Sequence, residues 1–436
     1  MDKRIIIVGA GVAGINAATK LVDNGYPGEL ITIIDKGNDP INRLPEEVMT
    51  GMLGAGGWSD GKLTYHTAIG GQLSKYCGED KAMELMKQVV DNFTRFHPKP
   101  EEIFMSDPQE EPEFIKPYFG LRMFPVWHIG SNFLHEIAKA WYQYLVDKGV
   151  KFKWQSEVDS IDFNTSTLSY QVWLDSELHS GYINYDKLIF AVGKSGIDFA
   201  QQLADNYQLP NEPKSVQIGV RFEAPQKYFQ KLIDVSYDFK LYQKFDNVSL
   251  RSFCTNNNAA YVAVEETYGD ITYNGHAKKG EEYRNDMTNF GILMEIKGID
   301  NPFEWSREVV NKLQINGKGL YYSPSRVAGV TSEGEIVKSY PIPNTYEISK
   351  IMNPYFGYIE GFIRDMNHIF NFGDDYGIYV PEVKYLSPEP LVDYTSLALT
   401  EYTNVHFVGD ALSARGITVS GAHGIYVAEY LLSNNN

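Results

Sequence analysis

Apolar runs and amphipathic stretches alternate through the first 35 residues of the chain. Residues 4–8, Arg-Ile-Ile-Ile-Val, form an almost unbroken β-branched run, which is typical of a strand buried on both faces. Residues 15–22 have the spacing of an amphipathic helix, and residues 30–34 form a second apolar strand that ends at Asp35. The pattern therefore predicts a β-α-β unit at the N-terminus.

A glycine pattern joins the first strand to the helix. Gly9, Gly11 and Gly14 have Gly-x-Gly-x-x-Gly spacing, and Asp35 follows Gly14 by 21 residues. Glycines here allow a tight turn, close approach of a pyrophosphate to the backbone, and packing of helix on strand, while the acid accepts from a ribose hydroxyl. The strand before and the helix after favour a dinucleotide site over an ordinary glycine-rich turn.

A second glycine-rich stretch, residues 51–63, follows the second strand. Its glycines would let the backbone approach a flat ring or a phosphate, so we favour a cofactor contact over a flexible loop. Ser59, Gly61 and Lys62 are its candidate contacts for pyrophosphate or flavin.

The stretch between residues 79 and 193 predicts a mixture of elements. We expect helices at 79–97 and 132–148, an irregular stretch at 98–125, strands at 150–154 and 157–163, and a hairpin over 168–185. A buried strand at 187–193 ends in Gly193, which is another candidate cofactor contact.

The pattern changes to short strands of period two between residues 211 and 300, which predicts an antiparallel sheet. The expected strands are 216–222, 237–242, 248–254, 261–266 and 291–296, and the expected helices are 304–315 and 346–371. Since this region interrupts the parallel-sheet pattern, we predict an α/β fold with a Rossmann-like domain and an inserted antiparallel β-rich domain. We place the first domain at 1–200 and 389–436, with an excursion at 76–125, and the insert at 201–388.

The C-terminal region carries a further cofactor signal. An apolar strand at 403–408 is followed by Gly409 and Asp410, and a glycine-containing stretch then leads into a last helix expected at 424–432. An acid in this position can accept from a ribityl hydroxyl, and the N-terminus of the following helix can face the electron-rich end of a flavin. This second element favours FAD over NAD, and it adds Thr418, Gly421 and His423 to the candidate cofactor contacts.

Composition and charge narrow the class of protein. The chain has 436 residues, a net charge of −17 and two cysteines without Cys-x-x-Cys spacing. The charge opposes nucleic-acid and anionic-membrane partners, and the cysteines support neither a disulfide framework nor a cysteine-rich metal site. We find no apolar run of membrane-spanning length and no room for a signal peptide before the first strand, so we expect a cytoplasmic protein. Oligomeric state is left open.

Motifs from end to end resemble the FAD-dependent dehydrogenase family of bacteria and their viruses, often labelled NAD(FAD)-utilizing dehydrogenases, within the glutathione-reductase-like two-dinucleotide-binding flavoproteins. The matching segments include the N-terminal fingerprint and residues 56–63, 128–130, 190–195, 218–226, 252–254, 274–275, 323–326 and 409–410. The resemblance implies the cofactor FAD and, at Val158, a backbone contact to adenine. The chain departs from the family at Asp35, where Glu is usual, and at residues 254–259, which lack the second cysteine and both glycines of a family loop.

Candidates for chemistry follow from residue type and position. His423 is a possible proton donor beside the flavin, against the alternative of a residue that only contacts backbone, and Lys62 is a candidate to neutralise a reduced, anionic flavin. Arg221 and Arg415 are candidates to hold a substrate carboxylate or phosphate, against the alternative of surface salt bridges. We expect no metal site, because the sequence shows no His, Asp or Glu cluster with ligand spacing.

These patterns together predict an FAD-dependent oxidoreductase, a dehydrogenase or reductase, that acts on a small or medium organic substrate held between the two domains. The redox direction is open, and NAD(P)H is a possible transient reductant, because no second intact Gly-x-Gly-x-x-Gly occurs. A flavin monooxygenase or alkene reductase is one alternative. A non-catalytic FAD-binding protein is another.

Overall fold

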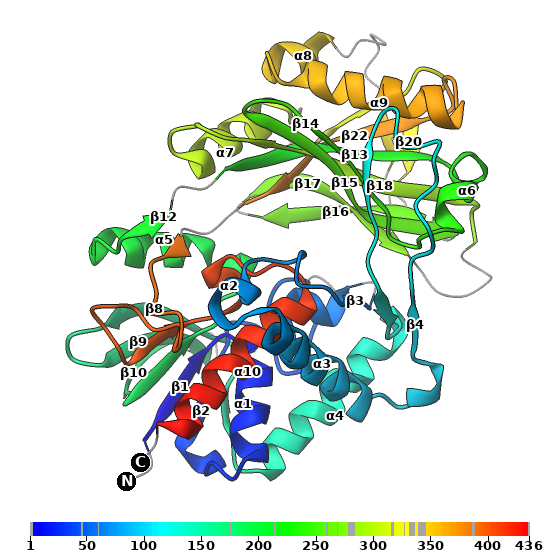
Figure 1. Cartoon of the computed structure of the whole chain (residues 1–436). Coiled ribbons are helices and arrows are strands. Elements are labelled where there is room, and N and C mark those ends of the chain that lie inside the picture. The colour runs from blue at the N-terminus through cyan, green and yellow to red at the C-terminus, as the bar shows by residue number, and fades with distance from the viewer. Residues whose placement is uncertain are drawn as a thin grey trace. The chain divides into compact units, whose positions relative to one another are not determined.

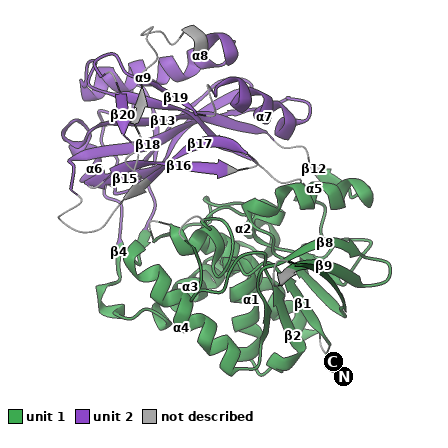
Figure 2. Ribbon diagram, turned by 180° about the vertical axis from the view of Figure 1, so that it is seen from behind, with its two compact units in different colours: residues 1–105, 126–213, 386–436 green, residues 106–125, 214–385 purple. Residues whose placement is uncertain are grey.

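In a computed structural model, the chain forms two compact units (Figures 1 and 2). Unit 1 comprises residues 1–105, 126–213 and 386–436, and unit 2 comprises residues 106–125 and 214–385. The structure describes residues 3–44, 47–59, 61–174, 177–212, 215–258, 260–267, 269–277, 284–314, 318–326, 328–330, 336–338, 346–385 and 389–434.

Unit 1 is built on a five-stranded parallel sheet in the order β24-β11-β1-β2-β7. The strands are β1 (Ile5–Val8), β2 (Ile31–Ile34), β7 (Lys151–Lys153), β11 (Lys187–Phe190) and β24 (Val405–Phe407). In chain order the sheet reads 3-2-1-4-5, the doubly wound arrangement, and the strand order reverses between β1 and β11. Ligands of such sheets bind beyond the carboxyl ends of the strands at this reversal, so the topology already indicates where a site belongs.

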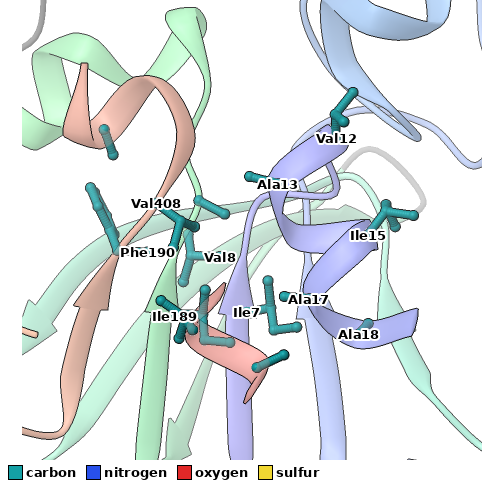
Figure 3. Packing of buried hydrophobic residues seen from close by; sticks show 14 of the residues in the cluster. Ile7, Val8, Val12, Ala13, Ile15, Ala17, Ala18, Ile189, Phe190 and Val408 are labelled. Carbon is teal, nitrogen blue, oxygen red and sulfur yellow. The ribbon is translucent and has the colours of Figure 1, made fainter. Parts of the chain in front are cut away.

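Two helices of unit 1 pack closely together. They are α1 (Val12–Asp23) and α10 (Ile417–Ser433), and a Cβ added at Gly424 would lie only 2.0 Å from the carbonyl oxygen of Ala13. In Figure 3, Ala13 and Ala17 of α1 lie over the apolar side chains of the sheet. The remaining helices of unit 1 are α2 (Leu73–Cys77), α3 (Glu79–Arg95), α4 (Leu134–Asp147) and α5 (Ile197–Asn206).

Smaller sheets complete unit 1. An antiparallel sheet in the order β10-β9-β8 contains β8 (Ser156–Asp162), β9 (Thr167–Leu174) and β10 (Glu177–Asn184). A second sheet, β3-β6-β4, contains β3 (Lys62–Thr64), β6 (Val126–His128) and β4 (Phe104–Ser106), and β12 (Asn211–Glu212) pairs with β23 (Glu389–Pro390).

Unit 2 contains a seven-stranded antiparallel sheet in the order β19-β22-β13-β18-β15-β14-β5. Its strands are β5 (Gly120–Arg122), β13 (Val216–Pro225), β14 (Lys240–Lys244), β15 (Val248–Asn258), β18 (Met287–Ile296), β19 (Leu320–Tyr322) and β22 (Gly377–Lys384). Outside this sheet, the described residues form hairpins of β16 (Ala260–Thr267) with β17 (Asp270–Ala277), and of β20 (Ala328–Val330) with β21 (Ile336–Lys338). The helices are α6 (Gln230–Ile233), α7 (Pro302–Lys312), α8 (Tyr346–Ile351) and α9 (Phe356–Phe370).

The two faces of the seven-stranded sheet differ in character. Phe222 of β13 stacks on Phe290 of β18 and packs against Phe372, so one face is an aromatic core. Because side chains alternate along a strand, the neighbouring positions Arg221 and Glu223 point to the opposite face. That face carries buried charges.

The α/β fold with a parallel sheet and an antiparallel β-rich part is the fold that the sequence predicts. The compact units differ from the expected domains in their limits. Unit 1 continues to residue 213, since the expected boundary at 200 falls inside α5, and residues 106–125 belong to unit 2, because β5 pairs with β14. The last helix begins seven residues before its expected start, and the expected helix over 346–371 is two helices, α8 and α9.

Candidate functional site

The structure gives a different answer at each of the three fingerprint positions to the question why glycine is needed there. Gly9 has φ +107°, and a Cβ there would lie 2.4 Å from the carbonyl oxygen of Ala191. A Cβ at Gly14 would lie 2.2 Å from the carbonyl oxygen of Gly9. Gly11 has φ −65°, which any residue adopts, and apart from its two chain neighbours no described residue has an atom within 4 Å of an added Cβ. Packing within the chain therefore explains Gly9 and Gly14 but does not explain Gly11.

Gly11 lies at a helix end that is suited to an anion. It is the N-cap residue of α1, and no side chain of the described residues caps this helix. Gly193, which follows β11 across the strand-order reversal, also has open space where a Cβ would be, as far as the described chain extends. The N–H groups of the first helical turn and the positive end of the helix dipole favour a phosphate group here. A helix end without a side-chain cap and with an open position at Gly11 is the arrangement that the pyrophosphate of a dinucleotide requires.

Asp35 lies directly after β2, as predicted, but its carboxylate also organises the backbone. Oδ2 accepts from the N–H of Ala10 at 2.7 Å, and Oδ1 accepts from the N–H groups of Gly37 and Gly51 at 2.8 Å each. A carboxylate offers about four acceptor positions. A ribose hydroxyl would therefore share Oδ2 with Ala10, and Asp35 ties the fingerprint loop to the glycine-rich segment after β2.

Arg43 is a component of the site that the sequence analysis missed. Its guanidinium donates to the carbonyl oxygens of Glu47, Val48, Met52 and Gly54, at distances from 2.5 to 3.2 Å. Burial lowers the pKa of Arg43 to about 10, and the charges of Asp35 and Glu47 act in the opposite direction. The only sequence signal for this role is an Arg inside a polar loop between the acid and the glycine-rich stretch.

The loop that Arg43 holds connects the two cofactor elements. The N–H of Leu53 donates to the carbonyl oxygen of Ala10 at 2.8 Å. A Cβ added at Gly56 would lie 2.5 Å from Val12 at the start of α1 and 3.4 Å from Ile417 at the start of α10. The glycine-rich segment thus contacts the first residues of both helices, which supports its predicted place beside a cofactor.

The other predicted residues of this segment have local structural roles. Ser59 Oγ donates to the carbonyl oxygen of Gly56 at 3.1 Å and accepts from the N–H of Gly61 at 3.2 Å, which closes a turn. Gly61 has φ +70°, and a Cβ there would lie 2.8 Å from the backbone nitrogen of Gly130. Lys62 is half-buried at the start of β3, opposite His128. Its contact with a flavin stays a prediction, and Asp60 of the same motif lies outside the described residues.

The C-terminal element brings Asp410 and Arg415 together. Asp410 follows Gly409, which has φ +66°, and Arg415 Nη1 lies 2.6 Å from Asp410 Oδ1. Next comes Gly416, the N-cap residue of α10, with φ +83° and no side-chain cap from any residue of the described chain. The start of α10 therefore offers a second helix end for an electron-rich group, with an arginine–aspartate pair beside it.

Two predicted residues of this element lie inside α10 and have packing roles instead. A Cβ at Gly421 would lie 2.8 Å from Val89 and 2.9 Å from Asn16, so Gly421 lets neighbouring helices approach. His423 is completely buried, its ring packs against Tyr76, and neither ring nitrogen has a hydrogen-bond partner in the described part of the chain. Burial lowers the pKa of His423 to about 4. The expected role as a proton donor is corrected, because this imidazole is neutral and enclosed.

Thr418 and Val158 have partners of their own. Thr418 Oγ1 donates to the carbonyl oxygen of Thr64 at 2.7 Å, which links α10 to β3. Val158 lies in β8, an edge strand of its sheet as described, and the start of β8 is tied to the acid through the N–H of Ser156, which donates to the carbonyl oxygen of Asp35 at 2.9 Å. Val158 therefore lies in a strand that begins beside Asp35, and its backbone contact to adenine stays a prediction.

Arg221 belongs to a buried ion pair in unit 2, not to a surface. Its side chain is fully buried and its Nη2 lies 2.6 Å from Glu382 Oε1. Because Glu382 already neutralises the charge of this guanidinium, its attraction for a substrate carboxylate is weak. The expected substrate contact of Arg221 is therefore corrected, as is the alternative of a surface salt bridge.

Two of the family-like segments meet in unit 2. Arg326 Nη1 lies 3.3 Å from Glu223 Oε1, and Arg326 Nη2 lies 2.9 Å from Asp375 Oδ1. Burial raises the pKa of Glu223 from 4.5 to about 7, and Arg326 opposes that rise. Glu223 therefore holds its proton more tightly in the folded chain than in the unfolded one.

This shift predicts a pH dependence of stability. A raised carboxyl pKa contributes stability below the unfolded value, and that contribution is lost as the pH rises from 4.5 through about 7. Between pH 5 and pH 8 the wild type should lose roughly 2.5 kcal/mol more unfolding free energy than Glu223→Gln. Urea unfolding of both proteins at the two pH values measures this difference, and equal losses would contradict it.

No group of three or more His, Cys, Asp or Glu side chains in the described ranges has an arrangement that could hold a metal ion. None of the helices within those ranges is both long enough and apolar enough to cross a bilayer.

Comparison with known proteins finds similarity in structure only. No protein family matches the chain, and no curated protein matches its sequence. Among solved structures, a mutant of the halogenase PltM in complex with FAD matches with TM-score 0.44 and 12% identity over 100% of this chain and 70% of that one. A flavoprotein/dehydrogenase from Cytophaga hutchinsonii matches with TM-score 0.40 and 10% identity over 99% and 78%. The flavin-dependent halogenase CmlS matches with TM-score 0.39 and 12% identity over 99% and 56%. Because these values are low, a function for this chain has to rest on its own residues.

Proposed function

We propose that unit 1 binds FAD, with the pyrophosphate at the N-terminus of α1 and the flavin toward the N-terminus of α10. The observation that carries this proposal is Gly11, whose missing side chain nothing in the described chain requires. A dinucleotide explains it, since the backbone must approach a pyrophosphate closely at this glycine. Gly56, which contacts the first residues of both helices, supports one extended ligand that follows the same loop.

Different residues of unit 1 bind different parts of this ligand. The N–H groups of α1 bind the pyrophosphate, Asp35 Oδ2 accepts from the ribose, and Asp410 accepts from the ribityl chain. Arg43 fixes the loop between them through its four carbonyl contacts. FAD, when bound, supplies hydride or electron transfer.

We further propose that the chain is an FAD-dependent oxidoreductase that acts on a small or medium organic substrate, with NAD(P)H as a possible transient reductant. The burial of His423 removes the expected protein proton donor, so proton exchange at the flavin would rely on Lys62 or on solvent. Arg415 remains the candidate to attract a substrate anion, in competition with its bond to Asp410.

The visible spectrum of the purified protein tests this proposal. We expect a yellow protein with flavin bands near ~375 and ~450 nm that releases FAD, not FMN, on denaturation, because the site has both a pyrophosphate turn and a ribose acid. A colourless protein that stays colourless after addition of FAD would contradict FAD binding. Stopped-flow mixing of the yellow protein with NADPH, with and without oxygen, separates a reductase from a monooxygenase and from a flavoprotein that does not turn over.

Asp410 gives a direct test of the ribityl contact. A hydrogen bond to a charged acceptor contributes roughly 1.5–3 kcal/mol, so Asp410→Ala should weaken FAD binding about 10- to 150-fold. Asp410→Asn should weaken it less, because the amide oxygen still accepts. Titration of the apo variants with FAD, followed by flavin fluorescence, gives both values. If Asp410 only caps the turn and holds Arg415, the Ala variant will lose thermal stability with unchanged FAD affinity.

A further inference from the structure

A buried polar cluster lies on one face of the seven-stranded sheet of unit 2. Its members are Arg221 of β13, Asn256 of β15, Asn289 of β18 and Glu382 of β22, none more than 4% exposed. The β16–β17 hairpin contributes Asn274, whose Oδ1 accepts from Arg221 Nη2 at 2.9 Å. Five elements that are distant in sequence therefore enclose one group of polar side chains.

The charges of this cluster compensate each other. Arg221 Nη2 lies 2.6 Å from Glu382 Oε1, and Arg221 Nη1 donates to the carbonyl oxygen of Cys254 at 3.0 Å and to Asn289 Oδ1 at 3.4 Å. The charges of Arg221 and Glu382 therefore neutralise each other within the cluster.

Four buried atoms of the cluster have no hydrogen-bond partner in the described chain. Two are donors, Arg221 Nε and Asn289 Nδ2, and two are acceptors, Asn256 Oδ1 and Glu382 Oε2. Buried polar atoms of native proteins are nearly always hydrogen-bonded, and each one left without a partner lowers stability. Four such atoms in one cluster need a common explanation.

Rotation of the amide groups does not supply the missing partners. Asn256 Nδ2 donates to the carbonyl oxygen of Cys254 and to Asn289 Oδ1, both at 3.1 Å. If the Asn256 amide were turned, its oxygen would face these two oxygens. If the Asn289 amide were turned, its NH₂ group would face Arg221 and the NH₂ group of Asn256. The present orientations are therefore fixed by their neighbours.

Two glycines let the cluster lie directly against the backbone, because the polar side chains occupy the positions that a Cβ would take. A Cβ at Gly275 would lie 2.2 Å from Asn256 Nδ2, 2.5 Å from Asn289 Oδ1 and 2.6 Å from Arg221 Nη1. A Cβ at Gly291 would lie 2.8 Å from Glu382 Oε2. Polar atoms of all four side chains thus lie against backbone positions where a side chain is missing.

We propose that this cluster is an internal hydration site that holds one or more ordered water molecules between Arg221, Asn256, Asn289 and Glu382. The bound molecule must both donate and accept, because the four atoms are two donors and two acceptors. It must be neutral, since an anion would meet Glu382 and a cation would meet Arg221. Buried waters typically make about three hydrogen bonds to otherwise unsatisfied groups, which this set provides.

This site gives Arg221 a role in place of substrate binding. The water completes the hydrogen bonding of an ion pair that joins β13, β22 and, through Asn274, the covering hairpin. Arg221 is therefore a structural residue of unit 2, and the inference is independent of whether unit 1 binds FAD.

A crystal structure of the wild-type chain at high resolution tests the proposal. We expect at least one water peak within about 3.2 Å of two or more of the four atoms. A structure in which these atoms bond directly to other protein atoms, with no water between them, would overturn it.

Water-oxygen magnetic relaxation provides a second test in solution, because it counts long-lived internal waters. Gly275→Ala places a methyl carbon within 2.6 Å of polar atoms of Asn256, Asn289 and Arg221, so these side chains must move and the site should lose at least one long-lived water. Gly357→Ala in α9 is the matched control, since apart from the backbone of its own helix no described residue has an atom within 4 Å of its added Cβ. Equal water counts in wild type and a folded Gly275→Ala would contradict the site. If that variant fails to fold, the wild-type crystal structure still decides.

Discussion

Replacing Gly11 by alanine should leave the fold intact and weaken FAD binding by about 100-fold or more. The backbone of Gly11 is at φ −65°, and apart from its two chain neighbours the new methyl group meets no described residue within 4 Å, so the apo protein has no reason to lose stability. In the FAD complex the same methyl group would occupy the space of the pyrophosphate. A 100-fold loss corresponds to about 2.7 kcal/mol. Flavin fluorescence titration and thermal unfolding of the apo protein measure the two effects separately.

Gly14→Ala is the matched control for this prediction. Its Cβ would lie 2.2 Å from the carbonyl oxygen of Gly9 and 2.9 Å from the buried side chain of Ile7. We therefore expect a lower melting temperature for Gly14→Ala even without FAD. If Gly11→Ala binds FAD as tightly as wild type, the proposed place of the pyrophosphate is wrong, whatever the spectrum of the protein shows.

Arg43→Met should both destabilise unit 1 and weaken FAD binding. The substitution leaves four backbone carbonyl groups of residues 47–54 without their common donor, at a cost of about 2–4 kcal/mol. The loop that contacts the starts of α1 and α10 would then lose its fixed shape. We expect FAD affinity to fall by more than tenfold at temperatures where the variant is still folded.

Arg43→Lys and Arg122→Met separate the role of Arg43 from general effects. Lysine keeps the charge but lacks the planar guanidinium with which arginine reaches four carbonyl groups. Arg43→Lys should therefore retain only part of the stability and of the FAD affinity. Arg122 is an exposed residue of β5 that lies over the ring of Tyr242, and its loss should change neither quantity. If Arg43→Met has a lower melting temperature but the folded variant binds FAD with wild-type affinity, Arg43 stabilises the unit without positioning the cofactor.

Local patterns in the sequence were sufficient for the β-α-β unit and for most strands. A β-branched run such as 5–8 is typical of a strand in the interior of a parallel sheet, and the glycine spacing fixes the turn that follows it. The period-two segments of unit 2 became strands because alternating apolar and polar positions suit an antiparallel sheet with two different faces. The expected boundaries failed where tertiary pairing decides them, as when β5 joins the sheet of unit 2 through β14.

The roles of individual site residues needed the tertiary structure. The sequence placed Asp35 and Asp410 after their strands, because an acid that follows an apolar strand lies at the sheet edge wherever the strand pairs. It placed His423 and Gly421 before the last helix, whereas α10 begins at Ile417, since a helix with Gly421 and Gly424 in it is stable only when other helices pack against those glycines.

Charge partners also come from tertiary structure alone. Arg221 and Glu382 are 161 residues apart and meet only because β13 pairs with β22. Arg43 binds carbonyl groups whose positions depend on the fold of its own loop, and no side-chain pattern encodes backbone acceptors. The sequence by itself therefore determined the strands, the nucleotide fingerprint and its acids. Only the tertiary structure decided which charged groups face a ligand and which are neutralised inside the protein, because that depends on partners that are distant along the chain.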